Sequence, residues 1–326
     1  MSKRAPKLPK LLKSKIYKTG QTRGADDDVI YQNRVNRNNT VLIPYSQLSV
    51  CLNSDIKADF YENDFIVLIN PEEYYTIKGF KENLKEQGLE IGHNALIFYY
   101  SRSQWNNYNP HTQKLTPATS RTSPLGGQYV ARVPATTSAK DSKIREGFNT
   151  SSLKGAGIRV YEYANLDTIK KCHTQLEYIY WNCIDSKAVS IEQGMTNEEV
   201  DERIKINAEI AKKLKLTDFK TLNDKRILNN AGNTICPLCL EEISANGFYS
   251  KVLQAEGREV SDLTVTQLNL FHIDELRTGS FNHRPYNLGW GHHHCNVVVK
   301  DSGIEETLKW MSSVIERNKK EGFTID

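Results

Sequence analysis

The first half of the chain alternates short apolar runs with polar segments, a pattern typical of β-strands joined by loops. Each run contains β-branched or aromatic residues and is bounded by Asn, Asp, Pro or Gly, which favours strands over helices. The runs are 40–45 (TVLIPY), 65–69 (FIVLI) and 95–100 (ALIFYY). A short amphipathic helix is predicted between Tyr75 and Gln87. The stretch 101–150 is rich in Ser, Thr, Asn, Gly and Pro, and it predicts long loops around one strand at 129–133.

The second half changes to a helical period after one more predicted strand at 157–163 (GIRVYEY). Apolar residues spaced about 3.6 apart predict a helix over 166–184. A second helix is expected to begin after Thr196, because acidic residues follow it and suit the positive end of a helix dipole, and to run to about Leu216. The segment 304–320 predicts a last amphipathic helix with an acidic start and a basic end.

The 326 residues are enough for about two domains, and the polar, turn-rich stretch 223–233 marks the expected boundary. We therefore expect an α+β protein with a basic N-terminal arm at 1–27, a mixed, β-rich domain with helices at 28–225, and a C-terminal domain at 226–326. The arm is either a tail that neutralises phosphates or a solvated tail that keeps the protein soluble. Its basic residues include Lys3, Arg4, Lys7, Lys10, Lys13, Lys15 and Lys18.

Composition excludes some classes of protein. A hydrophobic content of 38% and a charged content of 25% describe a soluble globular chain. No apolar run approaches the roughly 20 residues that cross a bilayer, so we expect no membrane association. No apolar segment or cleavage site follows the basic arm, so the cytoplasm is the expected location. The net charge of +4 is too small to indicate a nucleic-acid partner by itself.

The six cysteines divide into two groups. Cys51, Cys172 and Cys183 are scattered and are interpreted as buried small apolar side chains. The other three lie in the C-terminal region, where five of the eight histidines also occur. In a reducing compartment, this enrichment in Cys and His indicates metal binding rather than disulfide bonds.

Two Cys/His pairs have the spacing of a structural zinc site. Cys236 and Cys239 form a CxxC knuckle, whose tight turn directs both sulfurs to one point. His292 and Cys295 repeat the same two-residue gap. Three thiolates and one imidazole suit Zn²⁺, and four protein ligands are typical of a structural rather than a catalytic ion. The alternatives are a chance or redox-active CxxC pair and histidines that are only surface polar residues.

A further pattern lies between these two pairs. It consists of Leu270-Phe271-His272-Ile273-Asp274, a loop, Asn287-Leu288-Gly289-Trp290-Gly291, and then Cys295-Asn296. This arrangement resembles the HNH (ββα-metal) nucleases, whose pattern is CxxC, a strand ending in (D/H)HI, a loop, NL, and a second CxxC followed by H or N. The resemblance covers residues 233–312 or so, about a quarter of the chain.

The resemblance implies a role for three residues. His272 would be the general base that takes a proton from the attacking water, a task that suits an imidazole because its ordinary pKa lies near neutrality. Asn287 would brace the loop and help to orient the base, and Asn296 would be a ligand of a catalytic cation. The alternative for His272 is a core histidine whose hydrogen bonds are satisfied.

The catalytic cation implied by the resemblance is Mg²⁺ or a similar divalent ion, distinct from the zinc. The sequence departs from the family at Phe271, where Asp is common and serves as a metal ligand. Asp274 lies two residues beyond His272 and shares a face with it in strand geometry, so it is the candidate for the missing carboxylate. Glu275 and His283 are the other residues close enough in sequence to serve.

The length of chain before the HNH-like segment indicates a separate device for reading DNA. Side chains suited to base edges and phosphates occur in 99–129 and around the HNH-like segment, although ordinary polar loops have the same composition. The candidate DNA contacts are Arg102, Gln104, Asn106, Arg121, Arg284 and Lys300. The organisation resembles HNH-type type II restriction endonucleases. This resemblance implies double-stranded DNA as the substrate, a homodimer in which each subunit cuts one strand, and 3′ overhangs.

Two alternatives remain open at this point. A modification-dependent or homing HNH endonuclease would need methylated DNA or an unusually long target. A zinc-stapled DNA-binding protein without activity would fit the departure at Phe271. A nuclease of the PD-(D/E)xK kind in the first half finds little support, because no convincing carboxylate pair with a following Lys stands on a well-formed strand there.

Overall fold

The computed structural model describes most of the chain, which divides into two compact units. The described residues are 5–17, 41–49, 65–118, 127–131, 133, 144, 164, 166–250, 253–254, 258–259, 266–276, 281–300 and 302–323. Unit 1 contains Met1–Thr19, Asp167–Arg277 and Asn282–Asp326, and unit 2 contains Gly20–Leu166 and Thr278–Phe281. Some sequence predictions fall outside the described residues, namely the strand at 157–163, Cys51, Arg121, Lys3, Arg4 and Lys18.

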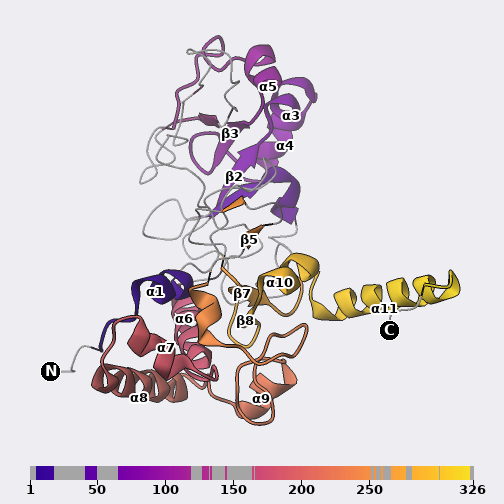
Figure 1. Cartoon of the computed structure of the whole chain (residues 1–326). Helices are drawn as coiled ribbons and strands as arrows, with labels where there is room; N and C mark the ends of the chain where they lie inside the picture. The colour runs from indigo at the N-terminus through magenta and orange to yellow at the C-terminus, as the bar shows by residue number, and fades with distance from the viewer. Residues whose placement is uncertain are drawn as a thin grey trace. The chain divides into compact units, whose positions relative to one another are not determined.

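Unit 2 is built on a four-stranded parallel sheet in the order β1-β2-β3-β4 (Figure 1). The strands are β1 (Val41–Pro44), β2 (Phe65–Ile69), β3 (Ala95–Tyr99) and β4 (Tyr129–Ala131). The register places Leu68 beside Leu96 and Ile97 beside Tyr129. The four strands predicted at 40–45, 65–69, 95–100 and 129–133 are confirmed, and some of them end one or two residues earlier or later than expected.

The α+β class is confirmed for the described residues. The expectation of a mixed, β-rich domain does not fit unit 2, because its sheet is parallel. Parallel strands need crossover connections, and helices supply them. The helices are α3 (Pro71–Thr76) and α4 (Phe80–Glu86) between β2 and β3, and α5 (Arg102–Asn107) in the stretch predicted as loops. Ile66 and Leu68 pack into one apolar cluster, and Val67 and Ile69 pack into another with Phe80 of α4. Burial on both faces explains why these strands are apolar without alternation.

The helix predicted from Tyr75 to Gln87 is two helices. Asn70 caps α3 by accepting a hydrogen bond from the Glu72 N–H at 2.9 Å, so this helix begins earlier than expected. Gly79 then separates α3 from α4 with a left-handed φ of 81°, a conformation that costs little for glycine. The prediction of one continuous helix was therefore wrong, because the break between α3 and α4 depends on the backbone conformation of a single residue.

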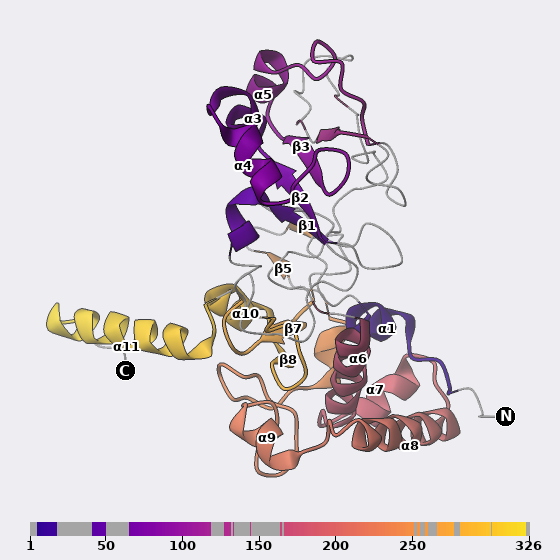
Figure 2. The same ribbon diagram turned by 180° about the vertical axis from the view of Figure 1, so that it is seen from behind.

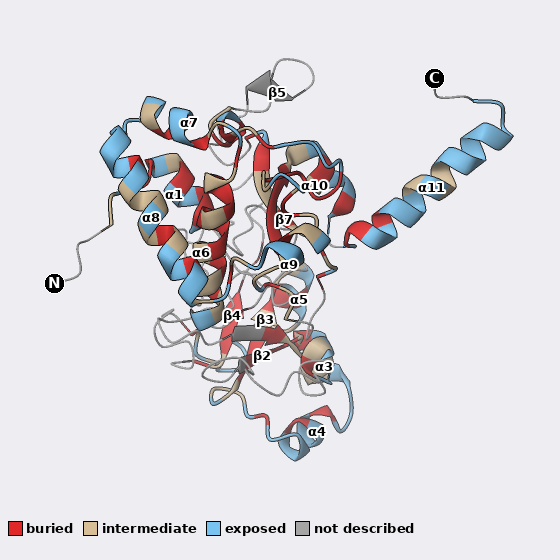
Figure 3. Cartoon of the chain, turned by 90° about the horizontal axis from the view of Figure 1, so that it is seen from below, coloured by how far each residue is buried: buried red, intermediate tan, exposed pale blue. Residues whose placement is uncertain are grey.

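Unit 1 combines helices with two small antiparallel strand pairs (Figure 2). Its elements are α1 (Lys10–Ile16), α6 (Leu166–Trp181), α7 (Ser186–Glu192), α8 (Asn197–Lys213), α9 (Phe219–Asp224), β5 (Leu253–Gln254), β6 (Arg258–Glu259), β7 (Leu268–His272), β8 (Leu288–His292), α10 (His293–Val299) and α11 (Ile304–Lys320). Trp290 of β8 is buried, and its Nε1 donates to the Leu176 carbonyl of α6 at 3.0 Å. Figure 3 shows buried residues along α6 and β7, where this core lies. Among the described helices, none combines the length and apolar character that a membrane crossing requires.

Helices α6 to α9 belong to unit 1, although they precede the domain boundary expected from the sequence. The reason is burial, because Leu176 and Tyr180 of α6 enter the same apolar core as Trp290. The two predicted helices within 166–216 are confirmed as α6 and α8. A capping box between Thr196 and Glu199 begins α8, as the acidic residues after Thr196 indicated.

The described part of the N-terminal arm is folded. Leu12 and Ile16 lie one turn apart on α1, and both are fully buried in the core of unit 1. The Lys15 ammonium is also buried, and its Nζ donates to the Leu268 carbonyl of β7 at 2.8 Å. The prediction of a basic tail is therefore wrong for residues 5–17, because the apolar spacing makes this segment part of a core.

Candidate functional site

Four predicted zinc ligands converge in unit 1. The ligand atoms of Cys236, Cys239, His292 and Cys295 all lie within 4.8 Å of one another. Cys236 and Cys239 stand in a turn closed by a hydrogen bond from the Leu240 N–H to the Cys236 carbonyl at 2.9 Å. His292 ends β8 and precedes α10, and Cys295 lies in the first turn of that helix. The cluster therefore joins the CxxC turn to the junction of β8 and α10.

The donor set fits a tetrahedral Zn²⁺ ion. The Cys239 Sγ lies 3.3 Å from the His292 Nδ1. Two ligand atoms around a tetrahedral zinc ion are separated by a similar distance, roughly 3.6 Å. Cys236 and Cys295 are buried, whereas Cys239 is exposed. Three sulfurs and one nitrogen would fill all four positions, which suits an ion that stabilises the fold rather than one that binds substrate.

The Cys236 thiol is prepared for metal binding by its surroundings. Burial raises its pKa, but hydrogen bonds from the His292 side chain and from backbone N–H groups outweigh burial and lower the pKa to about 6. The hydrogen bond with Cys236 raises the pKa of His292, against the effect of burial. For Cys295, burial and the neighbouring thiols raise the pKa. Metals bind thiolates, and a lowered pKa favours the thiolate form of Cys236.

His272 is the last residue of β7, and the paired strand β8 ends at His292 of the Cys₃His cluster. The register pairs His272 with Leu288 and Leu268 with His292, so the two histidines lie at opposite ends of one two-stranded ladder. His272 is half-buried. Its Nε2 lies 3.0 Å from Nδ1 of His283, a side chain that is only 1% exposed.

Asn287 ties together the two ends of the loop that follows His272. The Asp274 N–H donates to its Oδ1 at 2.8 Å, and its Nδ2 donates to the Asn282 carbonyl at 2.7 Å. The Ile273 N–H also donates to the Asn287 carbonyl at 3.1 Å. Asn287 is 1% exposed, so these bonds are shielded from water. The position therefore requires an amide that can both accept and donate.

The structure gives Asp274 a partner that the sequence did not indicate. Its carboxylate contacts the Lys225 Nζ at 3.0 and 3.3 Å, and both side chains are 39% exposed. Lys225 directly follows α9, far from Asp274 in the sequence, so no local pattern could have identified this pair. Asn296 is half-buried on α10. The assignment of Asp274 and Asn296 to one cation site beside His272 stays a prediction.

Phe271 is a core residue rather than a replacement for a ligand. It is fully buried in the core of unit 1 and pairs with Gly289 across the strand ladder. A Cβ atom added at Gly291 would lie only 2.4 Å from the Phe271 Cδ2. The phenyl ring therefore occupies the space that a side chain on β8 would fill, and a carboxylate at 271 would be buried among apolar groups.

Three of the candidate DNA contacts, Arg102, Gln104 and Asn106, lie on α5. Arg102 is half-buried and Asn106 is exposed. Gln104, in contrast, is 1% exposed and forms a capping box with Ser101. Its Oε1 also accepts from the Tyr100 N–H at 3.0 Å. Gln104 is thus a structural residue, and its amide is not available to a base edge.

The two remaining candidate contacts belong to unit 1. Arg284 and Lys300 are both exposed, as phosphate contacts require. Lys300 ends α10 with a positive φ of 48°, so its backbone conformation stops the helix. Both assignments stay predictions.

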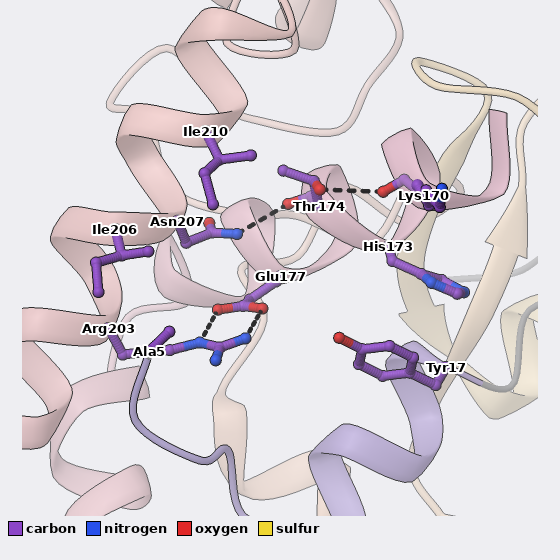
Figure 4. Close-up of a pocket in the computed structure, with 10 residues that line it drawn as sticks. All are labelled: Ala5, Tyr17, Lys170, His173, Thr174, Glu177, Arg203, Ile206, Asn207 and Ile210. Atoms are coloured by element: carbon purple, nitrogen blue, oxygen red, sulfur yellow. Dashed lines mark hydrogen bonds and ion pairs between the residues drawn. The ribbon is translucent and has the colours of Figure 1, made fainter. Parts of the chain in front are cut away.

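Unit 1 also contains a cavity of about 240 Å³ between α6 and α8 that sequence reasoning missed (Figure 4). A nearly buried ion pair dominates it, since Nε and Nη2 of Arg203 donate to the two carboxylate oxygens of Glu177, each at 2.6 Å. The Nη1 of Arg203 also donates to the Pro6 carbonyl at 2.8 Å. These bonds hold α6, α8 and the N-terminal segment together, which indicates a structural role.

Comparison with known proteins identifies the class to which this two-unit protein with a Cys₃His centre belongs. A family model described as the BstXI restriction endonuclease matches residues 14–293, which is more than half of the chain. The chain belongs to the BstXI restriction endonuclease family. No curated protein matches it.

One solved structure is similar to the chain at a low level. It is described as the crystal structure of a type II restriction endonuclease, and the match has a TM-score of 0.27 and 15% sequence identity. The match covers 49% of this chain and 58% of that chain. A TM-score this low is no evidence of a shared fold.

Proposed function

We propose that this protein is a site-specific endonuclease that cleaves double-stranded DNA by hydrolysing phosphodiester bonds. Membership of the BstXI restriction endonuclease family supports the substrate and the reaction. The chemical step is assigned to the β7–β8 strand pair and α10, which follow one another as in HNH nucleases. The observation that carries this assignment is the position of His272, at one end of a strand ladder whose other end is a metal ligand.

His272 acts as the general base in this proposal. The hydrogen bond with His283 orients the imidazole of His272, and the ordinary pKa of an imidazole allows proton transfer near neutrality. Asn287 fixes the loop that carries His283, so it positions the base without touching the substrate. The Cys₃His site would bind structural Zn²⁺ and hold the ends of β8 and α10 in place.

A divalent cation such as Mg²⁺ would stabilise the charge on the leaving 3′ oxygen. Asn296 and Asp274 are the proposed ligands, with Glu275 and His283 as the alternatives to Asp274. The Asp274 carboxylate is 39% exposed, so it remains open to a cation even while Lys225 neutralises it. Arg284 and Lys300 are proposed phosphate contacts, and Arg102, Asn106 and Arg121 are proposed DNA contacts of unit 2.

We further propose a homodimer that cuts one strand with each subunit and leaves 3′ overhangs. A modification-dependent or homing endonuclease is the alternative within the same chemistry. A digest of methylated and unmethylated genomic DNA with Mg²⁺, followed by sequencing of the cut ends, distinguishes these possibilities. Discrete ends at one short sequence in unmethylated DNA support the proposal, and random nicking counts against it.

A second candidate function is a zinc-stabilised DNA-binding protein without activity. The burial of Phe271 and the Asp274–Lys225 pair favour it, because both leave the site with fewer free carboxylates. The variant His272→Ala separates the two candidates. We expect cleavage to fall by at least about a hundredfold while DNA binding in a gel-shift assay is retained. The matched control is His93→Ala, an exposed histidine of unit 2, which should cleave normally.

A further inference from the structure

Helix α11 leaves the body of unit 1 and presents most of its length to solvent. It begins with a hydrogen bond from the Ile304 N–H to the Ile273 carbonyl at 2.9 Å. Ile304 and Thr307 are buried, but the later turns are exposed (Figure 3). Figures 1 and 2 show the helix extending away from β7, β8 and α10. A helix of 17 residues is marginally stable in water without a partner for its apolar face.

The exposed part of α11 has a continuous apolar face. Ile304, Leu308, Met311 and Ile315 follow one another at intervals of four, three and four, the spacing of a helix that packs along another helix. Unit 1 covers part of this face, since Ile304 is buried and Met311 packs partly against the core. Leu308 is 38% exposed and Ile315 is 42% exposed. Trp310, which lies on a different side of the helix from Leu308, is 57% exposed.

The charges of α11 have opposite signs at its two ends. Glu305 and Glu306 lie in the first turn, and Arg317, Lys319 and Lys320 lie in the last. Two copies of this helix packed antiparallel would place each acidic end beside the basic end of the other. Packed parallel, like charges and like ends of the helix dipole would meet. The charge pattern is therefore complementary to itself under a two-fold axis.

We propose that α11 pairs antiparallel with α11 of a second copy of this chain and forms its dimer interface. Such an isologous contact uses the same surface on both subunits, which is the symmetry of most homodimers. Leu308 of one copy packs against Ile315 of the other, near the centre of the pair. Glu305, which flanks the apolar face, comes to lie near Lys319 of the partner. The proposal deepens the proposed function, because it locates the contact that brings two cutting sites together.

Glu305 can form this additional ion pair with Lys319 of the partner subunit. Its Oε1 already contacts Lys309 of its own helix at 2.9 Å, yet its side chain is 84% exposed. Asn318 follows Ile315 by three residues and continues the apolar face with an amide. A single amide on such a face favours one register over others, which is how paired helices select their alignment.

Sedimentation velocity of the zinc-loaded full-length protein, without DNA and Mg²⁺, tests the interface. We expect a dimer for the natural sequence, and we expect Ile315→Asp to weaken its association by at least about tenfold, because a carboxylate would be desolvated in the contact. The control is Ser313→Asp, which adds the same charge two residues away, on the opposite side of the helix. A monomer for the natural sequence, or a dimer equally unaffected by both variants, overturns the proposal.

A charge exchange tests the antiparallel orientation. Glu305→Lys alone and Lys319→Glu alone should each weaken the homodimer, because like charges would face one another. An equimolar mixture of the two variants should recover a heterodimer, since each new lysine would then face a new glutamate. Failure of the mixture to associate more tightly than either variant alone contradicts the antiparallel pair. Circular dichroism of each variant checks that the helix is retained.

The assembly assay is independent of the proposed chemistry. His272→Ala should remain dimeric while losing cleavage. Ile315→Asp should become monomeric, and an assay of DNA nicking by this variant shows whether its chemical site is intact. A dimer that never cleaves DNA contradicts the proposed function alone. An active endonuclease whose association ignores every change in α11 contradicts the interface alone.

Discussion

The Nε2 of His272 and the Nδ1 of His283 lie 3.0 Å apart, so one imidazole holds the other. His283 is 1% exposed and is carried by a loop that Asn287 braces from both ends, whereas His272 is half-buried at the end of a strand. The buried ring is therefore the fixed member of the pair. A ring held in this way keeps one orientation and one tautomer, which a general base requires.

Replacing His283 should reduce the rate of DNA cleavage more than it reduces DNA binding. We expect His283→Leu to lower kcat by about tenfold to a hundredfold, because His272 would lose the group that orients it. His283→Asn should recover part of the rate, since its amide keeps a polar atom near the Nδ1 position. Single-turnover cleavage and a gel-shift assay measure the two quantities separately. Equal losses of rate and binding in both variants would instead indicate a damaged fold.

Substitutions of Asp274 and of Lys225 should have different effects on the Mg²⁺ concentration that cleavage requires. If Asp274 binds the cation, Asp274→Asn should raise the Mg²⁺ concentration for half-maximal cleavage by about tenfold or more. Lys225→Met removes the competing ammonium, so it should leave that concentration unchanged or lower it. Titration of cleavage against Mg²⁺ is the measurement. Similar shifts for both variants would mean that the pair only stabilises the loop, and Glu275→Gln then tests the next candidate.

Removal of one ligand should empty the Cys₃His site. Cys295→Ser should reduce the bound zinc from about one ion per chain to none, and it should lower the free energy of unfolding by several kcal/mol, because metal binding and folding are coupled. Atomic emission and thermal unfolding measure these effects. Cys172→Ala, at a buried cysteine of α6 outside the cluster, should retain the zinc. An unchanged zinc content in Cys295→Ser would remove this residue from the ligand set.

Two neighbouring glycines of β8 should respond differently to alanine. At Gly291 the new Cβ would meet the Phe271 ring at 2.4 Å, so we expect a loss of about 1–3 kcal/mol in the free energy of unfolding. At Gly289 the nearest atom would be the Pro237 Cγ at 3.4 Å, so the loss should stay below about 1 kcal/mol. Urea unfolding of both variants makes the comparison. A larger loss for Gly289→Ala would contradict the packing of Phe271.

The nearly buried ion pair of Figure 4 should be far more important than an exposed one. Glu177→Gln leaves the Arg203 guanidinium without its counter-ion where the two side chains are only 6% and 16% exposed, so we expect a loss of about 3–5 kcal/mol. Asp201→Asn removes an equivalent contact with Lys187, but those side chains are 67% and 64% exposed, and the loss should be below about 1 kcal/mol. Comparable unfolding midpoints for both variants would contradict this difference.

The sequence predicted the elements whose signals are local. The amphipathic spacing of 304–320 and the capping residues after Thr196 placed α11 and α8 correctly. The Cys₃His cluster was also recognisable, because two pairs with equal gaps depend only on short-range geometry, and its occupation by zinc stays a prediction. The continuous apolar runs FIVLI and ALIFYY contained a signal for a parallel sheet buried on both faces, which the prediction of a mixed domain did not use.

The rest depends on contacts between distant residues, which no local pattern records. Lys225 meets Asp274 and Arg203 meets Glu177 only after the helices have packed. Gln104 looked available for base contacts, but the Ser101 cap turned its amide into the protein. The N-terminal lysines suggested a solvated tail. The segment is instead folded, because the apolar residues between the lysines, Leu12 and Ile16, are buried in the core.

The chain leaves unit 1 after residue 19 and re-enters it at residue 167. Helix α1 is anchored to β7 by the bond from Lys15 to Leu268, so both junctions of this excursion begin from residues fixed in the same core. Such a topology allows the inserted segment to diverge, or to be exchanged between relatives in a chimaera, while the metal ligands and the strand that carries His272 stay untouched. If unit 2 reads the target, as proposed, new target preferences can evolve without rebuilding the proposed hydrolytic site.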